Sequence, residues 1–525
     1  MGRASYRAVI VPPLLTIRKS TLRLLQTFKA VGGLVVFAGE PPQHVDARPS
    51  IAAADTARIC VKAPAKGKAL ADAVEAACRR VSILDENGDE IGPVLHLLQE
   101  DDDAFYLFVC NTGYDFARGK RGSRVDVPVR ERDAAFPNAR VLLYAPCKGA
   151  PIELDPQTGE TCAAAAEKTP QGWMIQAPLA PLASRIFVIP KDAAAAKLPS
   201  RPVFAHSHAE ELDPDEWEIA LSECNNLVLD RPVCRIGSAK PRGPEEVLRV
   251  DVAVREALGI PPRGGRMVQP WARKPNPNPK SIPVSLTYAF DVKTLPTGDL
   301  ALAVERPDLY RIAVNGFPLD IDAQNGWWTD LSLRRIPFDP ALLRLGANTI
   351  TLDCDYREDH PGLEIIYLLG AFGVAVRDTD ATLIPQPQTL KLGDWVRQGL
   401  PFYSGSVTYL KTFRRKLSRK ERLFVEIPDY RGVAARILVN GRDAGVIGWP
   451  PNELDITDLL QDGAAALAIE VLGHRRNSHG PLHHAEKWPQ WTGHAQFVTE
   501  KDQWVDSYQL VPCGLMKPPR LIVRS

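Results

Sequence analysis

The 525-residue sequence lacks any long apolar run and carries almost no net charge. Its longest apolar stretches, such as 34–38 and 365–369, are far shorter than the roughly 20 residues that a membrane-spanning helix needs. Lys and Arg together number 64 against 63 for Asp and Glu, so no net field attracts nucleic acid or anionic lipid. We therefore expect no transmembrane helix and no nucleic-acid partner.

The sequence also lacks a C-x-x-C motif, and its nine cysteines are an odd number scattered along the chain. This pattern favours buried thiols over a disulfide framework. Only Cys224 and Cys234 are close enough in sequence for a local bridge, and the sequence leaves that bridge open. The first residues contain no basic region followed by a long apolar segment. We therefore expect no signal peptide, and the compartment stays open.

Composition indicates several folded domains rich in β structure. The length far exceeds what one hydrophobic core serves, which predicts three or four domains. Apolar residues make up 45% and charged residues 24%, as in ordinary globular proteins. The 46 prolines and 37 glycines are spread along the chain, which is typical of many short strands and turns.

The first 190 residues have an α/β pattern at first and a β pattern afterwards. Residues 6–38 have the pattern of a strand, a helix and a buried strand, and 68–80 have that of a second helix, so 1–80 is predicted to be a partial α/β domain. From 81 to 190, short apolar segments recur at the spacing of a small β-sandwich. An Ala/Pro-rich stretch then predicts a linker over 191–215.

The remaining chain contains an internal repeat. R-I-A-V-N-G at 311–316 recurs as R-I-L-V-N-G at 436–441, and D-L-S at 330–332 recurs as D-I-T at 455–457, both at an offset of 125 residues. A later L-L pair followed by Gly recurs at an offset of 117. Each copy combines an apolar strand with an Asn-Gly turn that readily takes positive φ. We predict two homologous β-sandwiches, at 216–378 and 379–525.

This order of motifs resembles the galactose-binding-like jelly-roll domains of glycoside hydrolases, notably family 2 and the family 106 α-L-rhamnosidases. Segments 400–409 and 508–515 resemble the opening and final strands of such domains. Upstream, G-L-V-V-F at 33–37 followed by G-E-P-P at 39–42 is similar to the glutamine-amidotransferase-like domain that follows the catalytic barrel in those enzymes. The L-D-P and T-G-E motifs at 154–160 resemble the small β-sandwich that comes next.

The sequence departs from that resemblance in its chemistry. None of Cys60, Cys78 or Cys110 stands in the Gly-x-Cys-x-Gly setting of an elbow nucleophile. No repeated strand–helix units remain to build a barrel with paired carboxylates. The resemblance therefore implies a non-catalytic accessory region without catalytic residues, whose partners are a glycan or glycoside and an upstream catalytic barrel. It also implies a secreted or periplasmic location. A free-standing lectin or a structural scaffold is the alternative.

Aromatic residues and histidines concentrate at 474–504 and beside the repeat motifs. Indole faces can stack on a pyranose while imidazole and carboxylate groups bind its hydroxyls; the bland interpretation is a long loop that covers the sandwich. The candidate carbohydrate-binding residues are Trp327, Trp328, Trp449, His483, His484, Glu486, Trp488 and Trp491. Of the adjacent Trp327 and Trp328, alternation along a strand predicts one core ring and one rim ring. Trp449 is predicted to be the better exposed candidate.

Metal and acid/base sites are weaker predictions. His479, His483 and His484 have helical spacings, but Gly480-Pro481 interrupts them, so we expect no transition metal. The resemblance makes a structural calcium possible, and no other cofactor is expected. Four carboxylates that lie in or beside strands have no visible partner for glycoside hydrolysis, and we interpret them as structural. They are Glu305, Asp353, Asp355 and Glu364.

Overall fold

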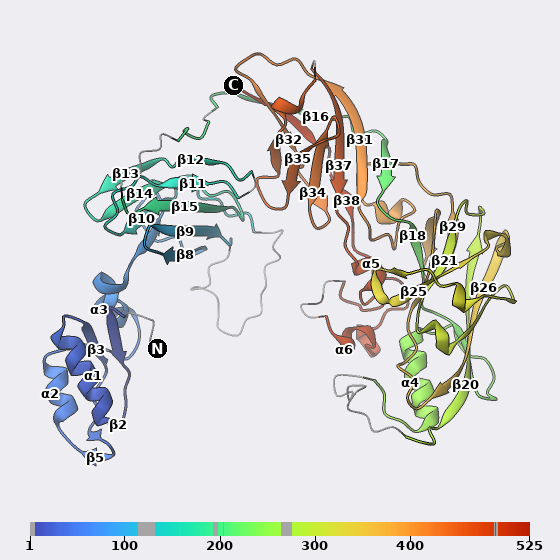
Figure 1. Cartoon of the computed structure of the whole chain (residues 1–525), viewed down its shortest axis with the longest axis horizontal. Coiled ribbons are helices and arrows are strands. Elements are labelled where there is room, and N and C mark those ends of the chain that lie inside the picture. The colour runs from blue at the N-terminus through green and yellow to red at the C-terminus, as the bar shows by residue number, and fades with distance from the viewer. Residues whose placement is uncertain are drawn as a thin grey trace. The chain divides into compact units, whose positions relative to one another are not determined.

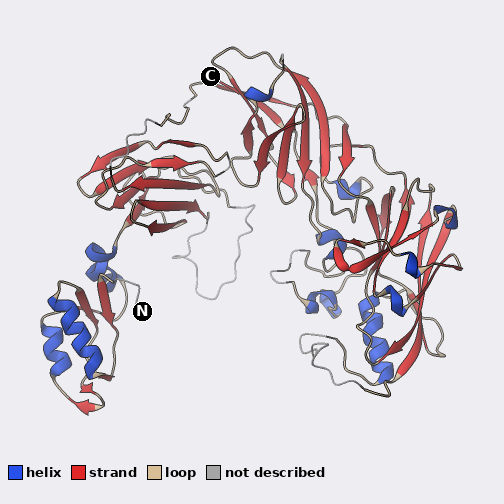
Figure 2. Ribbon diagram, viewed as in Figure 1, coloured by secondary structure: helices blue, strands red, loops and turns tan. Residues whose placement is uncertain are grey.

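The computed structural model is mainly β (Figures 1 and 2) and divides into two compact units, Met1–Val203 and Phe204–Ser525. It describes residues 6–113, 132–156, 158–192, 198–202, 204–263, 276–461, 463–487, 489 and 492–525. The predicted fold class, several β-sandwiches preceded by a small α/β part, is confirmed. Within those residues, no helix is long and apolar enough to cross a bilayer.

The first unit begins with the predicted strand–helix–strand arrangement. Parallel strands in the order β1-β3-β6 form its sheet, and apolar residues of α1, among them Leu22 and Leu25, pack on the buried face of β3. A small second sheet in the order β2-β4-β5 completes this part. The elements are β1 (Ala8–Val11), β2 (Thr16–Ile17), α1 (Lys19–Ala30), β3 (Leu34–Ala38), β4 (His44–Val45), β5 (Arg48–Pro49), α2 (Ala52–Arg58), β6 (Val61–Ala63) and α3 (Lys68–Cys78).

A sandwich of two antiparallel sheets follows in the same unit. One sheet has the order β13-β14-β10-β7 and the other the order β12-β11-β15-β9-β8. Alternate residues, including Phe105, Leu107 and Phe187, fill the space between them. The strands are β7 (Val81–Leu84), β8 (Val94–Glu100), β9 (Ala104–Asn111), β10 (Arg140–Tyr144), β11 (Ile152–Leu154), β12 (Thr161–Ala163), β13 (Ala166–Thr169), β14 (Gly172–Gln176) and β15 (Ser184–Pro190).

The second unit contains two more sandwiches, which we call the first and second copies. The first copy packs a sheet in the order β18-β27-β21-β25-β24 on one in the order β23-β22-β26-β20-β29-β28, with β19 also paired to β20. Its elements are β18 (Asn225–Leu229), β19 (Val233–Ile236), α4 (Val247–Leu258), β20 (Ser281–Val292), β21 (Leu300–Glu305), β22 (Arg311–Val314), β23 (Phe317–Pro318), β24 (Trp327–Trp328), β25 (Asp330–Phe338), β26 (Gly346–Arg357), β27 (Ile366–Gly370), β28 (Gly373–Arg377) and β29 (Asp380–Ile384).

The second copy has sheets in the orders β16-β39-β32-β36 and β30-β17-β31-β37-β34-β35. Strand β17 falls inside the range 216–378 yet pairs with β30 and β31, and its Trp217 is fully buried in the second core. Sequence order alone does not reveal which sheet such a strand joins. The strands are β16 (Ser207–Glu211), β17 (Trp217–Leu221), β30 (Thr389–Leu390), β31 (Val407–Arg414), β32 (Arg422–Glu426), β34 (Ala435–Val439), β35 (Arg442–Ile447), β36 (Glu453–Asp455), β37 (Ala464–Val471) and β39 (Arg520–Arg524), with β33 (Tyr430–Arg431) and β38 (Gly514–Leu515) forming a separate pair.

The repeated Asn-Gly turn makes the same hydrogen bonds in both copies. Asn315 has φ 49° and donates to the Leu342 carbonyl at 2.8 Å, while its side-chain oxygen accepts from the Thr349 N–H at 2.9 Å. Asn440 has φ 51° and makes the equivalent bonds to Leu459 and Ala466, both at 2.9 Å. Both partners are shifted by 117 residues, so the repeat reflects a shared hydrogen-bonding pattern.

The cysteines are free thiols, but the prediction that they are buried holds for only four of them, because Cys78 is exposed and the others are partly exposed; the buried four are Cys147, Cys234, Cys354 and Cys513. All nine lie in the described part of the chain, and no disulfide joins Cys224 to Cys234. Burial raises the pKa of Cys60 and Cys110, and neither is an activated nucleophile.

Candidate functional site

The histidine- and tryptophan-rich segment of the second copy contacts the first copy. His483 is 4% exposed, and its Nε2 lies 2.9 Å from the Asp230 carboxylate, which also accepts from the Tyr508 hydroxyl at 2.7 Å. The His483 ring stacks on Trp504. We call this contact between Asp230, His483, Trp504 and Tyr508 the seam. Because both ring nitrogens of His483 already have protein partners, the second being the Val505 carbonyl, the ring has none left for a sugar.

The other candidates in this segment differ in position. His484 is also 4% exposed, and its Nδ1 accepts from the Glu486 N–H at 3.0 Å. Glu486 is exposed. Trp488 and Trp491 lie outside the described residues. Of the described candidates in this segment, Glu486 is thus an open carboxylate, and the rings of His483 and His484 are buried and bonded.

The histidines proposed for a metal have separate environments. His479 stacks on Tyr367 at a ring distance of 5.1 Å, whereas His483 bonds Asp230 and His484 bonds its own loop. No group of three His, Cys, Asp or Glu side chains that could hold a metal occurs in the described ranges. Those ranges therefore provide no cluster of such side chains for the structural calcium that the resemblance implies.

The adjacent tryptophans of the first copy lie on a tight hairpin formed by β24 and β25. Thr329, at φ 65°, makes the turn, and Trp328 pairs with Asp330 across it. Trp327 is 52% exposed and Trp328 only 7% exposed, which confirms the prediction of one rim and one core ring. The hairpin thus anchors one indole and presents the other to solvent.

An aromatic cluster holds the buried indole. The Trp328 ring lies 4.9 Å from Tyr367 and 5.3 Å from His479, and the Tyr367 hydroxyl donates to the Ser478 carbonyl at 3.1 Å. Burial, reinforced by the Arg475 cation, lowers the pKa of His479 to about 4, so its ring is neutral at pH 7. Tyr367 was missed in the sequence because it lies within an apolar run that indicates only a buried strand.

Polar groups border this cluster. The Asp330 carboxylate accepts from the Ser332 N–H at 2.8 Å, and the Ser332 hydroxyl donates to Glu305 at 3.1 Å. Arg475 lies 6.0 Å from the Trp328 ring and forms a bidentate ion pair with Glu223. Aromatic faces bordered by a few polar groups are the usual composition of a small-ligand site.

The four carboxylates considered for acid/base chemistry are not equivalent. Burial, and secondarily the charge of Glu364, raises the pKa of Glu305, whereas Glu364 is ion-paired with Arg263. Glu305 ends β21, and Glu364 lies just before β27, its neighbouring strand. Asp353 and Asp355 lie on β26, which belongs to the opposite sheet. The two glutamates thus lie close enough for the charge of Glu364 to contribute to the raised pKa of Glu305, a feature that the sequence did not reveal.

The exposed indole of the second copy lies in a different setting. Trp449 is 45% exposed, slightly less than Trp327, so the prediction that it is the better exposed ring was wrong. It lies two residues after the end of β35 and directly precedes the Pro450–Pro451 pair. None of the aromatic ring contacts identified among the described residues involves Trp449.

Two side-chain pairs combine a nucleophile with a histidine, as a catalytic centre would, but both nucleophiles are buried. Cys513 lies 3.1 Å from Nε2 of His474, but it is 1% exposed, and burial raises the pKa of its thiol to about 12. Ser478 lies 2.7 Å from Nδ1 of His479 and 2.5 Å from the Ser404 hydroxyl, yet it is completely buried. Neither group can reach a substrate, so both pairs are structural.

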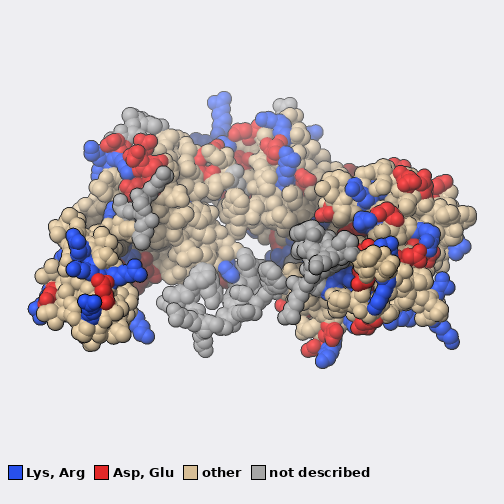
Figure 3. Space-filling view, turned by 60° about the horizontal axis from the view of Figure 1, so that its bottom comes forward, with Lys and Arg blue, Asp and Glu red and all other residues tan. Residues whose placement is uncertain are grey.

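The surface offers mixed charge and shallow grooves. Basic and acidic side chains are intermixed on the face drawn in Figure 3. A groove of about 520 Å³ lies beside the β28–β29 hairpin, and Val376, Val396 and Leu510 form part of its lining. Neither Trp327 nor Trp449 lines this groove.

Comparison with known proteins gives only distant likenesses. No protein-family model matches the chain, and no curated protein matches it. A rhamnosidase from Novosphingobium sp. PP1Y is 13% identical with a TM-score of 0.43, and the match covers 97% of this chain and 33% of that enzyme. An α-L-rhamnosidase from Streptomyces avermitilis is 16% identical with a TM-score of 0.17, covering 36% of this chain and 21% of the other.

A third glycoside hydrolase is similarly distant. The β-glucuronidase of Bifidobacterium dentium is 18% identical with a TM-score of 0.19, covering 29% of this chain and 28% of that one. The chain thus spans about a third of the length of the first rhamnosidase. At these values the likenesses establish neither an activity nor a substrate for this chain.

Proposed function

We propose that this chain is a non-catalytic, carbohydrate-binding accessory region of a glycoside hydrolase, with its glycan contact on the β24–β25 hairpin of the first copy. The observation that carries the proposal is the pair of adjacent indoles: Trp328 is fixed in the aromatic cluster, and Trp327 is held open to solvent. A rigid, exposed indole can stack on the apolar face of a pyranose at a low entropic cost.

Polar side chains next to Trp327 complete the proposed contact. Arg334 is its direct cross-strand neighbour and is exposed, and Asn325 lies on the same hairpin with its side-chain oxygen 3.5 Å from Arg335. Directly opposed residues on paired strands have Cβ atoms about 5 Å apart. Guanidinium and amide groups at that range can bind sugar hydroxyls around a stacked ring.

The accessory role rests on the chemistry of the groups described above. The two Cys/Ser–His pairs are buried, and Glu364 is ion-paired with Arg263. In this proposal residues 1–80 are an amidotransferase-like remnant and 81–190 a supporting sandwich. The catalytic barrel is the covalent partner, and a free-standing lectin or scaffold is the alternative.

Glycan-array binding of the full chain tests the proposal, with Trp327→Ala as the variant and Trp449→Ala as the matched control. We expect loss of binding in the first and retention in the second, because only Trp327 has the anchored partner ring. We also expect no turnover of aryl glycosides by either protein. Unchanged binding by Trp327→Ala would refute the site, and hydrolysis by the wild-type chain would refute the accessory role.

A further inference from the structure

Strand β8 has one edge that no other described strand pairs with. Among the residues that the structure describes, it is the last strand of its sheet and pairs only with β9. At its two ends the Thr112 N–H donates to the Pro93 carbonyl at 3.0 Å, and the Asp101 N–H donates to the Ala104 carbonyl at 3.2 Å. Since hydrogen-bonded pairs alternate along an antiparallel ladder, the odd-numbered residues bond β9. The backbone groups of His96, Leu98 and Glu100 therefore point outward.

Two other edge strands of the same sandwich, β7 and β12, are covered by the chain itself. The open side of β7 is occupied by the following loop, where the Ile91 N–H donates to the Ile83 carbonyl at 2.9 Å. Edge strand β12 is covered where the Ala163 N–H donates to the Pro199 carbonyl at 2.9 Å. No such backbone bond reaches His96, Leu98 or Glu100 from the residues that the structure describes. Proteins normally protect an edge strand, so an open one identifies a surface for strand addition.

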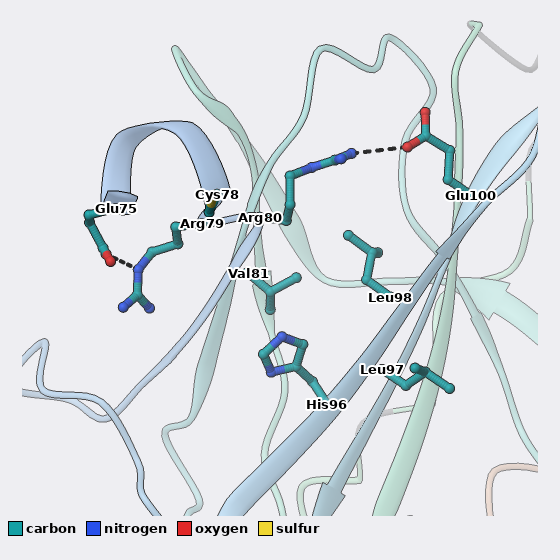
Figure 4. A pocket seen from close by; sticks show the side chains of 9 residues that line it. All are labelled: Glu75, Cys78, Arg79, Arg80, Val81, His96, Leu97, Leu98 and Glu100. Atoms are coloured by element: carbon teal, nitrogen blue, oxygen red, sulfur yellow. Dashed lines mark hydrogen bonds and ion pairs between the residues drawn. The ribbon is translucent and has the colours of Figure 1, made fainter. Parts of the chain in front are cut away.

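A groove of about 540 Å³ runs along this open edge. Figure 4 shows Val81 beside His96 within it, with the ion pair between Arg80 and Glu100 at one end. Arg79 is paired in turn with Glu75. Because these guanidinium groups already have carboxylate partners, the groove presents little net charge and favours an uncharged segment.

The outer face of the same strand pair is apolar and exposed. Leu95 is 48% exposed and Leu97 is 57% exposed, and on β9 Tyr106 and Phe108 are 38% and 39% exposed. Leu97 pairs directly with Phe108. An added strand with alternating apolar residues would extend this face while its backbone bonds the open edge.

We propose that β8 accepts an extended, uncharged segment of another polypeptide as an added strand. The outward N–H and C=O groups of His96 and Leu98 supply the main-chain hydrogen bonds. The outer-face leucines receive its alternate apolar side chains. This inference is independent of the proposed glycan contact, which lies in the other unit of the chain.

The test measures amide hydrogen exchange across β8 in the full chain. The probe is the heptapeptide Lys-Thr-Val-Thr-Val-Thr-Lys, whose five central residues form the uncharged strand and whose terminal lysines only keep it soluble. We expect the amides of His96 and Leu98 to exchange rapidly in the free protein and to become protected when peptide is added. His96→Pro removes one outward N–H without removing a bond to β9, so it abolishes this protection. His96→Thr keeps the N–H and serves as the matched control.

Leu97→Lys is a second variant, which places a charge on the outer face and weakens peptide binding without changing any backbone group. Three results would overturn the proposal. The first is protection of the His96 and Leu98 amides in the free, dilute chain. The second is equal protection of the wild type and of His96→Pro by the peptide. Protection that rises with protein concentration without peptide would identify a second copy of the chain as the occupant instead.

Discussion

The two copies share a scaffold and differ in what they build on it. Both use the same asparagine turn, and both use an aspartate that accepts from the backbone two residues later, in Asp330 and Asp455. The position of Trp328, however, is taken 125 residues later by Glu453, which forms a bidentate ion pair with Arg524 at 2.7 Å. The repeat therefore conserves the turn that sets the strands, while the flanking positions are used differently.

The first copy also depends on its neighbour for part of its core. Phe402 and Leu482 come from the second copy's range yet belong to the hydrophobic core of the first. The Asn226 side chain donates to the Phe402 carbonyl at 2.9 Å. At the seam, the buried Asp230 carboxylate of the first copy also bonds His483 and Tyr508 of the second. The β24–β25 hairpin thus belongs to a sandwich whose core includes residues of the second copy. In the second copy, by contrast, Glu453 pairs with a residue of its own sheet.

Replacing the buried indole gives the largest expected effect on this comparison. Trp328→Ala leaves a cavity between Tyr367 and His479 and should lower the free energy of unfolding by about 3–5 kcal/mol. Glu453→Ala at the related position removes a partly buried ion pair and should cost about 1–2 kcal/mol. Denaturant unfolding followed by tryptophan fluorescence, with a second probe such as circular dichroism, measures both. Equal losses would contradict the difference between the copies.

Replacing the shared asparagine tests the similarity instead. Asn315→Ala and Asn440→Ala each lose side-chain hydrogen bonds and place alanine at positive φ, which should cost about 2–3 kcal/mol. Asn315 also donates to the fully buried Asn348 at 2.8 Å, whereas the second donation of Asn440, to the Ala464 carbonyl, is longer at 3.3 Å, so the first copy should lose slightly more. Glycine at the same positions relieves the backbone strain and should recover part of the loss. No recovery with glycine would mean that positive φ contributes nothing.

Local patterns in the sequence predicted much of this fold, and distant contacts account for what it missed. The Asn-Gly turns, the rim and core indoles and the early strand–helix–strand unit depend on local backbone conformation, namely positive φ, side-chain alternation and helical periodicity, which restricts the residue types at each position. His483 and Asp230 are 253 residues apart, so nothing near the histidine reveals that its ring is already bonded. Strand β17 joins the second copy for the same nonlocal reason. Tyr367 in an apolar strand looks like ordinary core.

A buried carboxyl group beside the seam gives the last test, in which the effect depends on pH. Glu246 is 3% exposed and accepts from the Arg249 N–H at 3.1 Å at the start of α4. Burial, reinforced by the charge of Asp230, raises its pKa from 4.5 to about 8. The folded chain therefore binds this proton more tightly than the unfolded chain does. Its contribution to stability falls as pH rises from about 4.5 to 8 and stays constant above that range.

Glu246→Gln keeps an oxygen for the Arg249 N–H and cannot ionise. The variant should match the wild type near pH 4.5 and become more stable than it as pH approaches 8. One pKa unit is worth about 1.4 kcal/mol, so a gain of at least that size is expected across the window. Melting temperatures between pH 4.5 and 9 measure it. Glu245→Gln, which changes a more exposed carboxylate next to it, is the control and should leave the pH profile unchanged. If Glu246→Gln tracks the wild type at every pH, the pKa of Glu246 is not raised in the folded chain, and its burial does not make stability depend on pH.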